Sequence, residues 1–158
     1  MKQGLFICLF FLLCSKLFAK NNERISDSVE WKKLPAKGYT IYYTSSDEGQ
    51  IKSLNNYLRS GIDHITKFFD HSFAKDFDVY LFPDRSSLDK QWQKDWGDSS
   101  FHSECWMIAS GVAHRLDVLS PSAWAKEACD HGANDSTEIR QVIWHELSHV
   151  FHGQYNPD

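Results

Sequence analysis

The sequence lacks an apolar run long enough to cross a membrane. Its longest run is Leu5–Cys14, and at about ten residues it is half the length that a spanning helix needs. Clusters of basic residues are also missing, since 17 Lys+Arg stand against 21 Asp+Glu for a formal net charge of -4. We therefore expect no nucleic-acid partner. Repeats and low-complexity tracts are absent too, and 158 residues with 15% aromatics indicate one packed globular domain.

The first 19 residues are typical of a signal peptide. Lys2 gives a positive start, the apolar run follows, and Ala19 places a small residue at the cleavage point. We expect export to the periplasm or the exterior, with no stable membrane insertion after cleavage. A short membrane anchor is the alternative. Residues 20–38 are expected to form a polar leader ahead of the folded domain.

Cysteine is scarce once the signal peptide is removed, because only Cys105 and Cys129 remain. In an exported chain these two can form one disulfide, provided that their Cα atoms lie within about 7 Å. The alternative is a structural metal site that combines them with His102 and His131. The spacings His-x-x-Cys and Cys-x-His permit such a site, but they are not specific to it.

The remaining chain shows patterns of alternating strands and helices. Alternating aromatic and β-branched residues predict strands over 39–43, 77–82, 103–109 and 112–119, with a turn at Ser110-Gly111. Apolar residues at steps of three and four predict helices over 51–69, 86–96 and 135–153. Asp135 should cap the last helix, with Glu138 in the capping-box position, and Gly153 should end it. This order predicts an α+β fold, a small mixed sheet with packed helices.

The last predicted helix carries the sequence His145-Glu146-Leu147-Ser148-His149. Residues four apart on a helix project from one face, so His145 and His149 can bind one Zn²⁺. Glu146 is rotated by about 100° around the axis, where it is not a ligand but can reach a water beside the metal. Zinc lowers the pKa of such a water to about 7, and a carboxylate can then act as general base. The motif therefore predicts a catalytic zinc site.

Two segments resemble the zincin metallopeptidases, and most closely the gluzincin branch with its peptidase MA-like fold. They are the motif with its continuation, His145–Phe151, and the preceding strand region, Gly111–Pro121. The resemblance is specific at the motif and loose elsewhere, over roughly residues 39–155. It implies a zincin-like domain at 39–158 whose active-site helix lies under an edge strand of the sheet.

The resemblance also implies how a substrate and the metal are held. An extended peptide would add to the edge strand along Gly111, Val112, Ala113, His114 and Arg115. Gluzincins take their third zinc ligand from a glutamate on a later helix, whereas this sequence ends nine residues after His149. The expectation is therefore a zincin domain without its carboxy-terminal subdomain. His152 is a poor substitute, because it lies about 10.5 Å along the helix from His145 at about 1.5 Å per residue.

Three functional hypotheses follow. The first is zinc-dependent hydrolysis of a peptide or protein substrate, with Glu146 as general base. The second is a truncated or degenerate zincin that binds a peptide or a partner protein without catalysis. This hypothesis is based on the third zinc ligand that the sequence does not supply. The third is a zinc hydrolase acting on another class of substrate, because the motif specifies water activation and not the group attacked.

Overall fold

The computed structural model describes residues 29–132 and 135–156. The expected signal peptide and the first part of the expected leader lie outside the described residues. The elements, in chain order, are β1 (Lys32–Ala36), β2 (Tyr39–Tyr43), the short 3₁₀ helix η1 (Ser45–Asp47), α1 (Ile51–Phe69), β3 (Phe77–Phe82), α2 (Arg85–Trp96), β4 (Ala109–Val112), β5 (Arg115–Leu119), α3 (Pro121–Glu127) and α4 (Ser136–Tyr155). The fold is a small α+β domain, as the sequence predicts.

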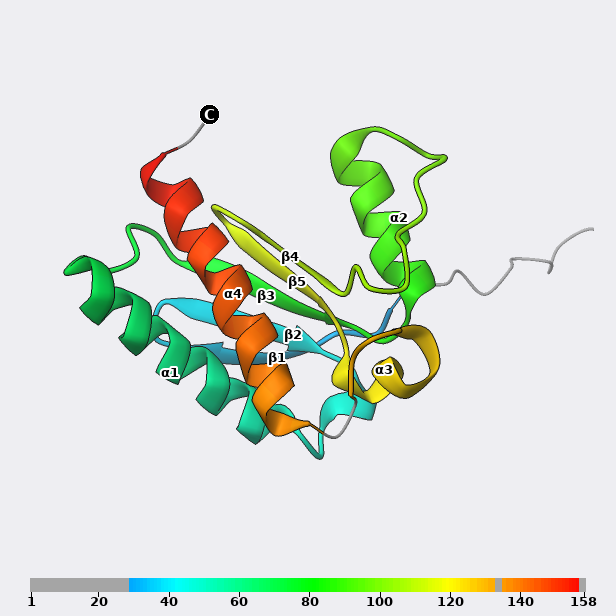
Figure 1. The fold of residues 1–158 in the computed structure, drawn as a ribbon, viewed down its shortest axis with the longest axis horizontal. Coiled ribbons are helices and arrows are strands. Elements are labelled where there is room, and N and C mark those ends of the chain that lie inside the picture. Colours follow the sequence, from blue (N-terminus) through cyan, green and yellow to red (C-terminus); the bar gives the residue numbers. More distant parts are fainter. Residues whose placement is uncertain (1–28, 133–134, 157–158) are drawn as a thin grey trace, which may run out of the picture.

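The five strands form one mixed sheet in the order β1-β2-β3-β5-β4 (Figure 1). The three central strands β2, β3 and β5 are parallel to one another, and the two outer strands β1 and β4 are antiparallel to their neighbours. Parallel strands need crossover connections, and α1 and α2 provide part of these. The strand β4 is therefore at one edge of the sheet, with only β5 as a strand partner.

The helices α1 and α4 pack together on one side of the sheet, where α4 crosses in front of the strands (Figure 1). The alternation of side chains along β5 separates the two sides. Leu116 is paired with Gly111, which touches α4, whereas Asp117 accepts a hydrogen bond from Trp92 of α2 on the opposite side. Apolar core residues lie between the sheet and the α1–α4 pair, among them the fully buried Leu147 of α4, and the core also includes Leu88 and Trp92 of α2 on the opposite side.

The side of the sheet under α2 contains a buried ion pair. Arg115 Nε lies 2.9 Å from Asp117 Oδ1, and the same guanidinium also contacts Asp95 of α2. Trp92 Nε1 donates to Asp117 Oδ2 at 3.2 Å. Burial raises the pKa of Asp117 to about 6, although the neighbouring Arg115 charge and these hydrogen bonds act in the opposite direction. Asp117 therefore takes up a proton at mildly acidic pH.

Several expected boundaries change. The strands at 39–43 and 77–82 and the helix at 51–69 are confirmed. Residues Lys32–Ala36 form the edge strand β1, so the prediction of a polar leader over residues 20–38 is wrong for this segment. The predicted strand over 103–109 is wrong except for its last residue, and the hairpin turn lies at Ala113-His114 instead of Ser110-Gly111.

Of the helices within residues 29–132 and 135–156, none has both the length and the apolar character required to cross a bilayer.

Candidate metal centre

The helix α4 carries the motif and begins at a well-formed cap. The Asp135 carboxylate accepts hydrogen bonds from the backbone N–H groups of Thr137 at 2.8 Å and Glu138 at 3.2 Å, which satisfies two free donors of the first turn. The helix continues past Gly153, where an end was predicted, and stops at Tyr155. Its buried stripe consists of Ile139, Ile143, Leu147, Val150 and Phe151. With this stripe in the core, His145 and His149 lie on the exposed part of the helix.

The two histidines of the motif converge on a single point. Their Nε2 atoms lie 3.1 Å apart, on rings that meet edge to face with centroids separated by 4.8 Å. Two nitrogen ligands at about 2.0–2.1 Å from one tetrahedral zinc ion would be separated by roughly 3.3–3.4 Å. The spacing of His145 and His149 therefore fits zinc after a shift of a few tenths of an ångström. Both residues are exposed, with 68% of the His145 side chain accessible.

Glu146 lies next to the histidine pair and is much better shielded. Its side chain is 13% exposed, and its Oε1 lies 4.0 Å from Nε2 of His145. At this distance a water molecule bound beside the two imidazoles would be within reach of the carboxylate. The structure thus brings His145, Glu146 and His149 together, as the motif predicts.

The edge strand β4 touches α4 through its backbone at Gly111. A Cβ atom added at Gly111 would lie 2.3 Å from the carbonyl oxygen of Glu146 and 3.2 Å from Cβ of His149. Near the end of the helix, Gly153 packs in the same way on the hairpin turn, where an added Cβ would lie 3.1 Å from the backbone N of Ala113. Because both positions are glycine, the helix and the β4–β5 hairpin approach each other closely.

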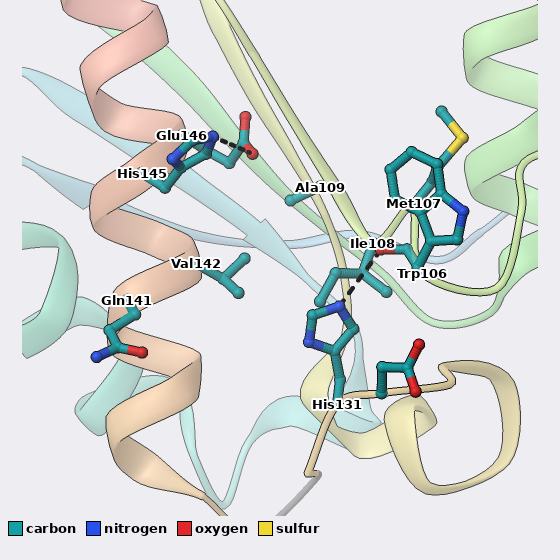
Figure 2. A pocket seen from close by; sticks show the side chains of 10 residues that line it. Trp106, Met107, Ile108, Ala109, His131, Gln141, Val142, His145 and Glu146 are labelled. Carbon is teal, nitrogen blue, oxygen red and sulfur yellow. Dashed lines mark hydrogen bonds and ion pairs between the residues drawn. The ribbon is translucent and has the colours of Figure 1, made fainter.

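A cleft of about 660 Å³ opens between α4 and the chain segment that leads into β4. Figure 2 shows His145, Glu146, Val142 and Gln141 of α4 on one side of it, with Trp106–Ala109 facing them from the other side. His131 and Asp130 line the remaining part. The volume falls within the range of small-molecule and side-chain pockets, and the walls contain the apolar residues Trp106, Met107, Ile108 and Val142.

The segment expected to hold the peptide, Gly111–Arg115, is divided by the hairpin. Gly111 and Val112 lie in the edge strand, and Val112 is 42% exposed. Ala113 and His114 form the turn, where Gln154 of α4 donates a hydrogen bond to the Ala113 carbonyl at 2.8 Å. Arg115 belongs to the inner strand β5 and faces α2. The edge of the sheet beside the motif is therefore Ala109–Val112.

The described residues place no third ligand beside the histidine pair. Within residues 29–132 and 135–156, no cluster of three or more His, Cys, Asp or Glu side chains has the geometry of a metal site. His152 is exposed on α4, and it does not join His145 and His149 in such a cluster.

Cys105 and Cys129 form a disulfide with a Cα–Cα distance of 5.3 Å. This is the pairing that we expected for an exported chain, and it leaves neither thiol free for the alternative metal site with His102 and His131. His102 lies 3.6 Å from Asp89, whereas His131 contacts Glu138 at 2.6 Å. The disulfide joins the segment before β4 to the segment before α4.

The sequence does not mark the cleft wall or His131 as parts of the site. Trp106–Ile108 lie in an irregular segment, although the sequence predicts a strand there. His131 is positioned by Glu138, whose pKa is held below its usual value by hydrogen bonds from the Gly132 N–H and from His131. The only signal in the sequence was the proximity of these residues to the two cysteines.

No protein-family model matches this chain, and a comparison with curated proteins gave no match either.

Proposed function

We propose that this protein is a zinc-dependent hydrolase of peptide bonds, with His145 and His149 as two zinc ligands and Glu146 as the general base. The observation that carries the proposal is the 3.1 Å separation of the two histidine Nε2 atoms on α4, next to a largely shielded carboxylate. Structural zinc sites use four protein ligands, whereas a catalytic site keeps a position open for water.

When bound, zinc would acidify a water molecule and polarise the carbonyl group of the substrate. His145 and His149 would hold the ion as neutral imidazoles through Nε2. Glu146 would accept the proton of the attacking water on Oε1, the atom nearest the histidine pair. The same carboxyl group could then deliver this proton to the leaving amine, since a general base acts as a general acid in the second half of the reaction.

The edge strand and the cleft favour a peptide as the substrate. An extended peptide that pairs with the edge of Ala109–Val112 would pass beside Glu146, because Gly111 lies against the backbone of that residue. A side chain of the peptide could then enter the cleft, where Trp106, Met107 and Val142 offer apolar contacts. We therefore expect cleavage next to a bulky apolar residue.

The experiment is a comparison of the metal content and the peptidase activity of the purified protein. We expect bound zinc, hydrolysis of casein and of short peptides with apolar residues, and inhibition by a chelator that zinc reverses. The comparison should include the chain extended by any downstream coding sequence, because the third ligand is expected on a later helix.

The outcomes separate the three hypotheses. Zinc binding without hydrolysis in both proteins would favour a non-catalytic module that binds peptides. Hydrolysis of esters or other acyl groups with no action on peptides would favour a different zinc hydrolase. Absence of zinc binding would refute the metal centre itself.

A further inference from the structure

The outer wall of the cleft has few hydrogen bonds of its own. Residues 103–108 belong to no helix or strand, yet this segment supplies Trp106, Met107 and Ile108 to the cleft. Trp106 is 58% exposed, so its packing alone does not fix its position. Backbone carbonyl groups in such a segment need hydrogen-bond donors from elsewhere in the protein. The position of this wall therefore depends on what binds its carbonyl groups.

Arg85, at the first position of α2, donates to three carbonyl groups of this segment, whereas the Trp106 carbonyl accepts from His131 Nε2 at 3.3 Å. The Arg85 guanidinium donates from Nη1 to the carbonyls of Glu104 and Met107, both at 2.9 Å, and from Nη2 to the carbonyl of Cys105 at 3.0 Å. Nη1 also donates to the Ser103 hydroxyl at 2.6 Å. These acceptors are uncharged, so the guanidinium organises a loop here instead of forming an ion pair.

The same guanidinium reaches the segment on the other side of the disulfide. Nε and Nη2 donate to the carbonyl of Glu127 at 3.1 and 2.7 Å, and the Arg85 backbone N–H donates to the Glu127 carboxylate at 2.6 Å. Arg85 and the disulfide therefore fasten the same two segments. The planar group of arginine with five N–H donors can serve acceptors on both sides, which the ammonium group of lysine cannot do in one plane.

The start of α2 does not depend on the Arg85 side chain. The Asp84 carboxylate caps the helix by accepting the Ser87 N–H at 2.7 Å, and Gly97 ends it. The buried side of α2 consists of Leu88, Asp89 and Trp92. A change of the Arg85 side chain should thus leave the helix in place and act on the loop.

We propose that Arg85 is a positioning residue for substrate recognition, which fixes the Trp106–Ile108 wall of the cleft opposite His145 and Glu146. This inference rests on the proposed peptidase function. Arg85 touches no substrate in this scheme. It sets the width of the cleft and the point at which the chain enters the edge strand at Ala109, so it should govern binding of the substrate side chain and not the chemical step.

The test compares Arg85→Met and Arg85→Lys with wild type and with the control Arg59→Met, which removes an exposed arginine on α1. Each protein is assayed with two peptides, one carrying phenylalanine at the position that fills the cleft and one carrying glycine there. For Arg85→Met we expect KM for the phenylalanine peptide to rise about tenfold, which corresponds to a loss of about 1.4 kcal/mol of apolar contact in the cleft. The kcat value, the zinc stoichiometry and KM for the glycine peptide should stay unchanged. KM of Arg85→Lys for the phenylalanine peptide should lie between those of wild type and Arg85→Met, and KM of Arg59→Met should equal that of wild type.

Hydrogen–deuterium exchange of residues 103–109 tests the same inference without an activity assay. We expect faster exchange in Arg85→Met than in wild type and Arg59→Met, with unchanged exchange in α2. Unaltered loop exchange, or an equal rise of KM for both peptides, would overturn the assignment. If the wild-type protein binds zinc but hydrolyses no peptide, the proposed function fails, and the exchange result alone decides the role of Arg85.

Discussion

Replacement of Gly111 by alanine tests the contact between the edge strand β4 and the helix α4, which carries the motif. The added Cβ would lie 2.3 Å from the Glu146 carbonyl oxygen and 3.1 Å from its carbonyl carbon. Both are backbone atoms, so no side-chain rotation relieves the overlap, and β4 must move away from α4 by about 1 Å to reach an ordinary contact distance. Overpacking of this kind costs about 1–3 kcal/mol. For a domain of this size the loss corresponds to a decrease in Tm of roughly 3–10 °C.

Thermal unfolding followed by circular dichroism measures this effect directly. The control is Gly49→Ala, because a Cβ atom at Gly49 has no neighbour within 4 Å and its φ is not positive. The control should melt within about 1 °C of wild type, whereas Gly111→Ala should melt lower and, in an active preparation, hydrolyse peptides more slowly at unchanged zinc stoichiometry. Equal Tm values for all three proteins would refute the reasoning, since a contact of 2.3 Å with backbone cannot be relieved without cost.

Three further predictions concern the metal, the base and a buried carboxyl group. His149→Ala should abolish stoichiometric zinc binding in a metal analysis, and zinc retained at one equivalent would rule out the histidine pair. Glu146→Gln should keep the metal and lose hydrolysis in the extended chain, so normal turnover would exclude its role as base. The pKa of Asp117 is about 6 in the folded protein against an ordinary 3.8, so the folded state binds more protons between these values and the free energy of unfolding falls as pH rises from about 4 to 6. Asp117→Asn should remove this dependence on pH. In urea unfolding, the free energy of unfolding of the variant should therefore rise by about 1–3 kcal/mol relative to that of wild type between pH 4 and pH 7. A difference between the two proteins that stays the same at both pH values would contradict the assigned pKa.

The sequence predicts the parts of the fold that are specified locally. The boundaries of α1 agree at both ends because its apolar residues repeat every three or four positions over nineteen residues. The cap of α4 at Asp135 is equally local. The edge strand β1 was missed because Lys32, Lys33 and Pro35 break the apolar pattern, although such residues are suited to an exposed edge. Its pairing with β2 is a tertiary feature that no short window contains.

Gly111 shows why the hairpin was misplaced. A glycine after serine, between two runs of apolar residues, is typical of a turn, and the prediction placed the turn there. In the structure Gly111 is inside β4, and its lack of a side chain is used for contact with Glu146. The proximity of His145, Glu146 and His149 could be predicted because it follows from their spacing along one helix. The cleft wall could not, because Arg85 and the disulfide position it from distant parts of the chain.

Gly111 and Gly153 together fix the orientation of α4 relative to the β4–β5 hairpin. Gly111 touches the backbone of Glu146 itself, and Gly153 touches the turn at Ala113 two helical turns further on. Two separated backbone contacts fix both the position and the direction of α4 relative to β4. Glu146, the proposed general base, and the edge proposed to hold the peptide thus belong to one rigid unit, whereas the opposite wall of the cleft is held by Arg85. Changes at the glycines should therefore alter stability and kcat together, while changes at Arg85 should act on KM alone.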